Sequence, residues 1–400
     1  MTKDQVEKDT VIETKEILNS VKLDEPESPK IKSEVKEIQK KTKEEKVEED
    51  LFTEFSSFLK DKTDIIPDIG EKKTISTGLD LMDAILGGGF AVGALNIVVG
   101  SPGSGKTMLA IKTMGKAQKQ YKGKLLSAFL DSEEATTTLR LSNLGVRFPK
   151  IQPYVDITVE KVFKFIEGLS VFKQEKKIVD TPSIVVWDSI ANTLSQKERE
   201  TNDPNTVIGY KARLLSILVP KYLAKCAQNN ICFLAINQLR DKLDLGMFSA
   251  PNDLKLMTAS KTMPGGNVLK FNAFQLVEMK PKSIIAPGKA EDSNKYGFEG
   301  VIVKCKCVKN KLFSPNVEIE IVGSFQTGFS NFWTNYNFLK LTKRIKAGAW
   351  NSLVILPETK FRVKDAKTTY ETDEKFKVAW DKSVKEAIET EIIDKYNPEI

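Results

Sequence analysis

The sequence predicts an α/β protein in which a mostly parallel sheet is flanked by helices. From about Thr74 onward, apolar strand-like runs alternate with helical patterns, an alternation typical of parallel sheets. A glycine-rich turn that joins a strand to a helix, residues 100–107, supports the same class. The central strand candidates are Leu95–Val99, Leu125–Leu130, Ile184–Trp187 and Ile231–Ile236. We expect two later runs, Val301–Val308 and Val317–Val322, to add antiparallel strands because polar and apolar residues alternate in them.

The N-terminal segment differs from the rest of the chain in charge. Residues 1–50 hold 11 lysines and 15 acidic residues, a charge of −4, which leaves 50 basic and 39 acidic residues, or +11, on residues 51–400. The segment has no glycine and no aromatic residue, and it has too few apolar residues to offset its ordering entropy. We expect a disordered tail, in which the spacing of Val6, Ile12, Ile17 and Val21 allows a partner-binding helix.

Three further regions follow the tail. Residues 51–73 are expected to form an oligomerisation helix and linker, because Phe52, Phe55 and Leu59 share one helical face. The core is expected to span residues 74–330. Residues 331–400 carry three tryptophans and many lysines, which predicts a small C-terminal α+β domain.

Composition excludes several kinds of chemistry. The chain has no histidine, so histidine acid–base catalysis, histidine metal sites and serine–histidine triads are ruled out. Its four cysteines match no zinc pattern and no disulfide framework, which predicts a reduced, intracellular protein. The first residues lack a secretory signal and no apolar run is long enough to span a bilayer. We therefore expect a cytoplasmic location and no membrane partner.

The strongest motif is a phosphate-binding loop. The run GSPGSGKT matches G-x-x-x-x-G-K-[ST], follows the strand ALNIVV and precedes an apolar helical pattern. In such a loop, backbone N–H groups and a helix N-terminus cradle phosphates. We expect Lys106 to reach the β- and γ-phosphates of ATP and the Thr107 hydroxyl to bind Mg²⁺. The loop residues are Gly100, Ser101, Pro102, Gly103, Ser104, Gly105, Lys106 and Thr107.

Carboxylates complete this nucleotide site. Asp188 ends the strand SIVVWD, where its carboxylate would accept from the water shell of Mg²⁺ beside Thr107. The next residue is serine, so the group that activates water must come from elsewhere. Glu133 follows the neighbouring strand at the carboxyl edge of the sheet and is the candidate, with Glu134 as its rival.

Six motifs in order resemble the RecA family of DNA recombinases. They are the segment ending in GSPGSGKT, then LDSE, IVVWDS, LAINQLR, PGGNVLKF and VKCKCVKNK, over Thr74–Gly323. The small C-terminal region and the absence of an N-terminal helix-hairpin-helix domain are most similar to phage UvsX-type members. The resemblance implies a RecA-like P-loop ATPase core.

The resemblance also implies roles for individual residues. Glu133 corresponds to the glutamate that activates water, and Gln238 to the glutamine that senses the γ-phosphate. Lys309 and Lys311 correspond to lysines that reach the ATP of a neighbouring protomer. Arg140 stands where many members stack an aromatic residue on adenine; its guanidinium could stack instead.

Two segments are expected to bind DNA. The first, Gln196–Asn205, is polar and turn-rich, and Arg213 in the next helix corresponds to a phosphate-contacting arginine. The second runs from Leu239 to Gly266; its cations would neutralise phosphates and an apolar side chain could wedge between bases. We expect Gly265 and Gly266 to hinge its return into a strand, NVLKF. The candidates in the second segment are Arg240, Lys242, Met247, Phe248, Lys255, Met257, Lys261, Met263, Gly265 and Gly266.

The resemblance implies an ATP- and Mg²⁺-dependent recombination and repair protein. It would form filaments on single-stranded DNA, pair that strand with homologous duplex and exchange strands, in a bacterial or phage-infected cell. Mediator or loader proteins and single-strand-binding proteins are possible partners. Two alternatives remain: a RecA-like replicative helicase, and a recombination mediator that exchanges no strands itself. A small-molecule kinase fits less well because no acceptor pocket or lid is recognisable.

Overall fold

We describe the fold from a computed structural model. The structure describes residues 53–54, 72–122, 124–134, 136–146, 151–154, 156–241, 256–257, 261–286 and 296–396. Predictions for the tail, for the helix around Phe52–Leu59 and for Lys242, Met247, Phe248 and Lys255 lie outside these residues. Residues Lys72–Ile400 form one compact unit.

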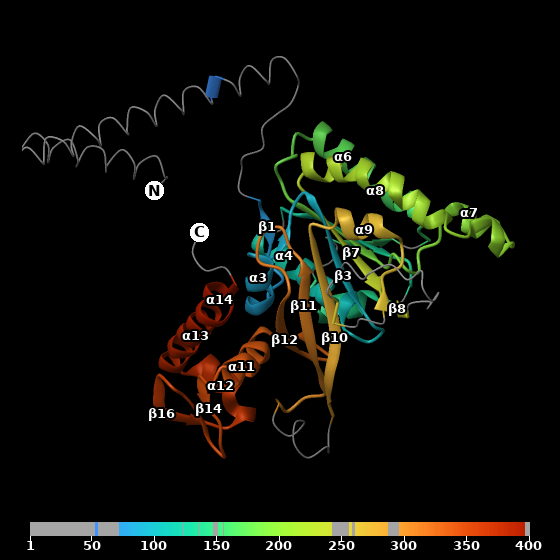
Figure 1. The fold of residues 1–400 in the computed structure, drawn as a ribbon. Helices are drawn as coiled ribbons and strands as arrows, with labels where there is room; N and C mark the ends of the chain where they lie inside the picture. Colours follow the sequence, from blue (N-terminus) through green and yellow to red (C-terminus); the bar gives the residue numbers. More distant parts are fainter. Residues whose placement is uncertain are drawn as a thin grey trace, which may run out of the picture. The chain divides into compact units, whose positions relative to one another are not determined.

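A nine-stranded sheet organises the unit (Figure 1). Its order is β13-β12-β11-β10-β3-β7-β6-β4-β5, and the pairs from β10 to β5 are parallel. β11, β12 and β13 add antiparallel strands at one edge, as predicted. The strands are β3 (Ala94–Gly100), β4 (Leu126–Asp131), β5 (Ile151–Tyr154), β6 (Ser183–Asp188), β7 (Ile231–Gln238), β10 (Gln275–Ile285), β11 (Gly300–Lys309), β12 (Val317–Ser324) and β13 (Gly328–Phe329).

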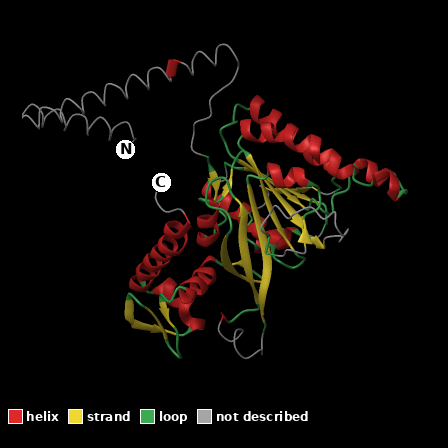
Figure 2. Ribbon diagram, in the orientation of Figure 1, coloured by secondary structure: helices red, strands yellow, loops and turns green. Residues whose placement is uncertain are grey.

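Helices cover both faces of this sheet (Figure 2). Along β3, Val98 packs in one buried cluster with α3 and α4, whereas Ile97 and Val99 pack in another with α6 and α8. The apolar residues of β3 thus alternate between two cores, which explains why a strand buried on both faces reads as a continuous apolar run. The helices of the core are α3 (Asp80–Leu86), α4 (Lys106–Gln120), α5 (Thr138–Asn143), α6 (Val159–Glu175), α7 (Gln196–Glu200), α8 (Tyr210–Gln228) and α9 (Asn267–Asn272).

The C-terminal elements have an aromatic core of their own. Trp380 is buried and stacks on Phe332 with ring centroids 4.6 Å apart, and Trp333 is buried beside them. The same cluster includes Ile302 of β11 and Val322 of β12, so it is continuous with the edge of the large sheet. The elements are α11 (Asn331–Leu341), β14 (Ile345–Lys346), β15 (Asn351–Leu353), β16 (Leu356–Phe361), α12 (Ala366–Thr372), α13 (Glu374–Ile388) and α14 (Asp394–Tyr396).

Several local expectations differ from the structure. NVLKF was expected to be a strand but forms helix α9, which follows Gly266. The following strand, β10, begins at Gln275 and was missed, because its charged second half does not read as a core strand. The polar segment from Gln196 to Asn205 was expected to be a loop but forms α7 and a short 3₁₀ helix, Pro204–Val207. A capping box explains α7: the Ser195 side chain accepts from the Glu198 backbone, and the Glu198 carboxylate accepts from the Ser195 backbone.

A buried lysine connects several elements at the amino ends of the parallel strands, the end of the sheet opposite the phosphate-binding loop. Lys173 of α6 is fully buried, and its ammonium donates to the Thr181 carbonyl (2.6 Å), the Ser183 hydroxyl (3.0 Å) and the Asn229 carbonyl. It therefore ties α6 to the start of β6 and to the end of α8. Burial lowers its pKa from 10.5 to about 8, and nearby Asp180 opposes this shift.

This pKa predicts a pH dependence of stability. Between pH 8 and about 10.5 the folded chain has released the Lys173 proton while the unfolded chain still holds it. Because the unfolded state binds more protons, stability from this group rises with pH, by at most about 1.4 kcal/mol per pH unit. Urea unfolding of the wild type and of Lys173→Met is the measurement: the difference in free energy of unfolding should shift in favour of the wild type across this range. A flat difference would contradict the assignment.

Candidate nucleotide and DNA sites

The phosphate-binding loop lies between β3 and α4, as predicted. Gly100 pairs with Gln238 of β7 at the carboxyl edge of the sheet. Two glycines are needed for close packing: a Cβ on Gly100 would lie 2.3 Å from the Met279 carbonyl oxygen, and one on Gly105, at φ 82°, would lie 2.6 Å from the Phe329 ring. The Lys106 ammonium donates to the Ser101 carbonyl (2.8 Å) and the Ser104 hydroxyl (3.4 Å) and so lies within the curl of the loop.

A cleft of about 390 Å³ opens beside this loop, and the predicted site residues meet in it. Lys106, Thr107, Glu133, Arg140, Asp188 and Gln238 all line the cleft. They come from the carboxyl ends of four neighbouring strands, β3, β4, β6 and β7, and from the helices that follow two of them, and they range along the chain from Lys106 to Gln238. Clefts at the carboxyl edge of an open α/β sheet are where ligands bind.

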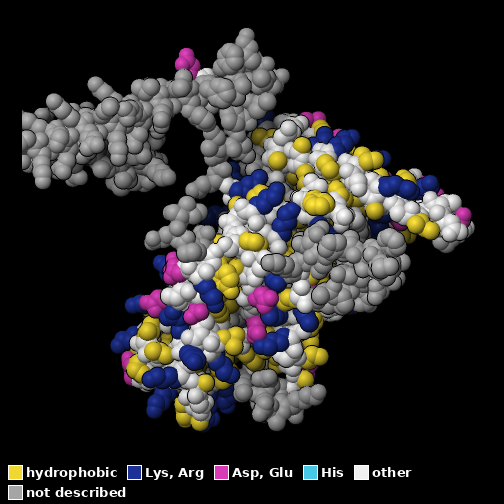
Figure 3. Space-filling view, viewed as in Figure 1, with side chains coloured by type: hydrophobic (Ala, Val, Ile, Leu, Met, Phe, Trp, Pro, Cys, Tyr) yellow, Lys and Arg dark blue, Asp and Glu magenta, His cyan; other side chains and the backbone are white. Residues whose placement is uncertain are grey.

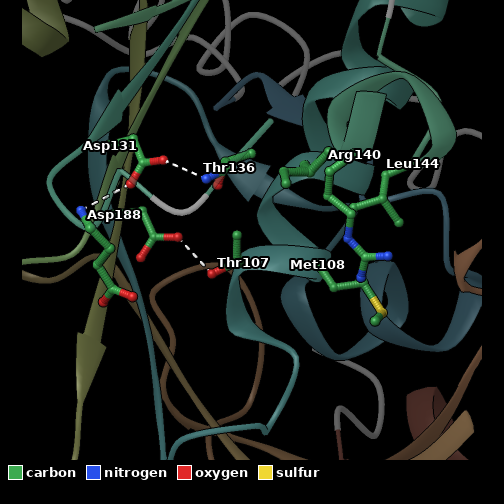
Figure 4. A pocket seen from close by; sticks show the side chains of 9 residues that line it. Thr107, Met108, Asp131, Thr136, Arg140, Leu144 and Asp188 are labelled. Carbon is green, nitrogen blue, oxygen red and sulfur yellow. Dashed lines mark hydrogen bonds between the residues drawn. The ribbon is translucent and has the colours of Figure 1, made fainter. Parts of the chain in front are cut away.

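Thr107 and Asp188 form the oxygen pair that was predicted to hold Mg²⁺ (Figure 4). The Thr107 hydroxyl donates to Asp188 Oδ2 at 2.6 Å. The pKa of Asp188 is raised to about 7: burial is the largest cause, the charges of Glu133 and Asp131 also raise it, and the Thr107 hydrogen bond and the Lys106 charge lower it. A bound cation would favour the charged carboxylate, and two hard oxygen ligands suit Mg²⁺. Among the described residues no group of three or more acidic or cysteine side chains could hold a metal alone, so phosphate oxygens and water would complete its shell.

Glu133 is the focus of a hydrogen-bond cluster. Its Oε1 accepts from the Ser189 hydroxyl (3.0 Å), the Asn192 amide (2.6 Å) and the Gln238 amide (3.2 Å). Asp131 fixes the turn that carries Glu133 by accepting from the backbone N–H groups of Glu133 and Thr136, both at 3.0 Å (Figure 4). The carboxylate thus has a defined place at the cleft, and the same bonds link it to Gln238.

Arg140 lines the cleft but contacts the protein as well. Its guanidinium donates to the Phe325 carbonyl oxygen at 2.7 Å, next to Met108 and Leu144 (Figure 4). Phe325 lies in the β12–β13 turn, is 45% exposed and also lines the cleft. Arg140 therefore joins α5 to this turn.

Lys309 and Lys311 are not among the residues that line the cleft in the described part of the chain. Lys309 pairs with Leu276, which pairs with Ile97, three residues and about 10 Å before Gly100. Its ammonium caps α9 by donating to the carbonyls of Lys270 (2.8 Å) and Phe271 (2.7 Å). Lys311 lies 5.6 Å from the centroid of the Phe274 ring. Neither lysine is placed to serve the phosphate loop of its own chain.

The predicted DNA-binding residues that are described lie around α7, around α8 and at the two ends of the second segment. Arg213 is exposed on α8 and donates to the Ile208 carbonyl (3.4 Å). Arg240 is exposed in β8 (Arg240–Asp241), which pairs with β9 (Lys261–Thr262). Gly265 and Gly266 have φ of 97° and 80°, a left-handed backbone that glycine adopts readily. Met263 is buried in the core, so it is not available to wedge between bases. Figure 3 shows Lys and Arg side chains at several places over α8 and α7.

Comparison with known proteins decides the family. Residues 58–330 match the RecA N-terminal domain family. The chain belongs to the RecA family. It is 31% identical to Protein RecA of Thermus aquaticus over 294 residues, which cover 73% of this chain and 76% of that protein. It is 30% identical to Protein RecA of Sulfurovum sp. (strain NBC37-1) over 280 residues, 70% of this chain and 73% of that protein.

RecA-family membership makes this chain a recombination and repair protein and a DNA-dependent ATPase that uses ATP with Mg²⁺. No helix among its described residues is long and apolar enough to cross a membrane.

Three polar residues of this RecA-family site were not predicted from the sequence. Ser189 and Asn192 donate to Glu133, and Asp131 shapes the turn that carries it. Their signal was present in type only, as short polar residues directly after apolar strands. For Ser189 and Asn192 the partner, Glu133, lies more than fifty residues away, so spacing could not reveal these contacts.

Proposed function

We propose that this protein polymerises on single-stranded DNA, pairs it with homologous duplex and exchanges strands under control of ATP. Glu133 would activate the attacking water, and Lys106 and Thr107 would hold phosphate and Mg²⁺ beside Asp188. The single observation that carries the proposal is the hydrogen bond between Glu133 and Gln238. Glu133 lies in the proposed ATP cleft, and Gln238 directly precedes the second proposed DNA-binding segment.

Within this proposal, Gln238 exchanges its Glu133 partner for the γ-phosphate and so alters the segment that begins at Leu239. Arg213, Arg240 and Lys261 would contact DNA phosphates, which predicts salt-dependent binding with little sequence preference. Lys309 and Lys311 would complete the ATP site of the next protomer. Arg140 would lie against the base.

We place the domain boundaries at residues 50, 73 and 330, and assign residues 51–73 to filament assembly. We also propose that the chain is a recombinase of the phage UvsX type. We propose further that loader and single-strand-binding proteins are its partners and that it acts on DNA in the cytoplasm.

Strand exchange with homologous and heterologous duplex tests the function. A filament formed on a single strand should convert homologous duplex to product in the presence of ATP and Mg²⁺ and leave heterologous duplex unchanged. Single-strand-stimulated hydrolysis without homologous exchange would favour the mediator reading. Directional unwinding of a forked duplex would favour the helicase reading.

A further inference from the structure

The turn after Asp188 carries two of the three donors to Glu133, Ser189 and Asn192. The Asn192 side chain on this turn donates to Glu133 Oε1 at 2.6 Å, the shortest of the three bonds to that oxygen. The buried residue Thr193 holds the turn in place through two hydrogen bonds. Its hydroxyl accepts from Trp187 Nε1 (2.7 Å) and donates to the Ser189 carbonyl (2.8 Å). The position of Asn192 is therefore set by the turn as a unit.

Lys211 binds the same turn from the other side. Its ammonium donates to the carbonyl oxygens of Ile190 (3.2 Å), Ala191 (3.1 Å) and Thr193 (2.8 Å). A lysine ammonium has three donors, and three carbonyls of one turn receive them. The Lys211 side chain therefore binds the backbone on both sides of Asn192.

Lys211 belongs to the part of the protein proposed to meet DNA. It lies in the first turn of α8, which begins at Tyr210, and precedes Arg213 by two residues. Burial lowers the pKa of Lys211, the charge of Glu198 on α7 raises it and the charge of Arg240 on β8 lowers it. Lys211 is therefore within electrostatic reach of both predicted DNA-binding segments.

We infer that Asn192 is a positioning residue for Glu133, and that Lys211 connects it to the DNA-contacting end of α8. DNA that shifts or orders this end of α8 would move the turn, and the turn would set the place of the Glu133 carboxylate. The inference rests on the proposed function, and it gives DNA-dependent hydrolysis a path through three side chains: Lys211, Asn192 and Glu133. That path is separate from the one through Gln238.

Steady-state hydrolysis with saturating poly(dT) tests the path. Asn192→Ala and Lys211→Met should each lower the DNA-stimulated kcat roughly 10- to 100-fold, because a misplaced catalytic group costs rate steeply. The KM for ATP should change by less than about twofold, since phosphate binding is untouched. Lys211→Arg, which keeps a cationic donor, should recover part of the rate. Lys221→Met, an exposed lysine further along α8, is the matched control and should behave as wild type.

The double variant separates a shared path from general damage. If both residues act through one turn, Asn192→Ala/Lys211→Met should be no slower than the slower single variant, whereas independent effects would multiply. Where poly(dT) stimulates the wild type, two results would overturn this inference but not the proposed function. One is multiplied effects in the double variant, and the other is an unchanged kcat in both single variants. Asn192 is exposed, so its variant remains informative even if Lys211→Met fails to fold. Absence of poly(dT) stimulation in the wild type would instead overturn the proposed function.

Discussion

Glu133→Gln lowers the kcat for ATP hydrolysis roughly 100-fold or more, while ATP-dependent binding to single-stranded DNA persists. A glutamine keeps the shape of the side chain but cannot take a proton from the attacking water, and general-base catalysis contributes about 10²- to 10⁴-fold. In the proposed site Lys106 and Thr107 bind the nucleotide, and the substitution leaves both in place. Hydrolysis by phosphate release and DNA affinity by fluorescence anisotropy measure the two effects on the same protein.

Glu134→Gln is the matched control for this prediction. Glu134 is the next carboxylate along the chain and is exposed, but the three donors from Ser189, Asn192 and Gln238 converge on Glu133. Glu134→Gln should therefore hydrolyse ATP at close to the wild-type rate. Wild-type hydrolysis by Glu133→Gln, or a slow Glu134→Gln, would reverse the assignment.

Lys309→Ala/Lys311→Ala is expected to lower the DNA-stimulated kcat about 100- to 1,000-fold, the range found when a positioned donor to transition-state charge is removed. The defect should appear only in the assembled filament, because both lysines lie away from the cleft of their own chain. Lys304→Ala, on the same strand, should leave the rate unchanged.

Thermal unfolding must accompany this test because Lys309 also caps α9. If the double variant unfolds near the wild-type temperature and forms filaments, a lower kcat reflects the loss of the lysines from the ATP site and not a loss of structure. A folded, filament-forming double variant with wild-type kcat would show that these lysines have no catalytic part.

Much of the architecture could be predicted from the sequence because its signals are local. A strand, a glycine-rich turn and a helix in register determine the phosphate loop, and a buried apolar run ending in Asp188 determines the neighbouring strand. The helix α9 was read as a strand because NVLKF is too short for its periodicity to separate the two states.

Contacts made by tertiary structure could not be predicted. Nothing in the spacing of Asn192 or Lys211 indicates that one bonds Glu133 and the other three backbone carbonyls. Arg140 is a similar case. A guanidinium at this position suggested stacking on a base, but its hydrogen bond to Phe325 depends on a turn 185 residues later in the chain.

Mixing two inactive proteins tests most directly whether the ATP site is shared between protomers of a DNA-bound filament. Glu133→Gln lacks the proposed base but keeps both lysines, and Lys309→Ala/Lys311→Ala keeps the proposed base but lacks the lysines. In a randomly mixed filament roughly one quarter of the head-to-tail interfaces would join an intact Glu133 to intact lysines. We predict that hydrolysis on poly(dT) reappears on mixing, well above the sum of the separate proteins. A mixture no faster than that sum would contradict a site built from two protomers.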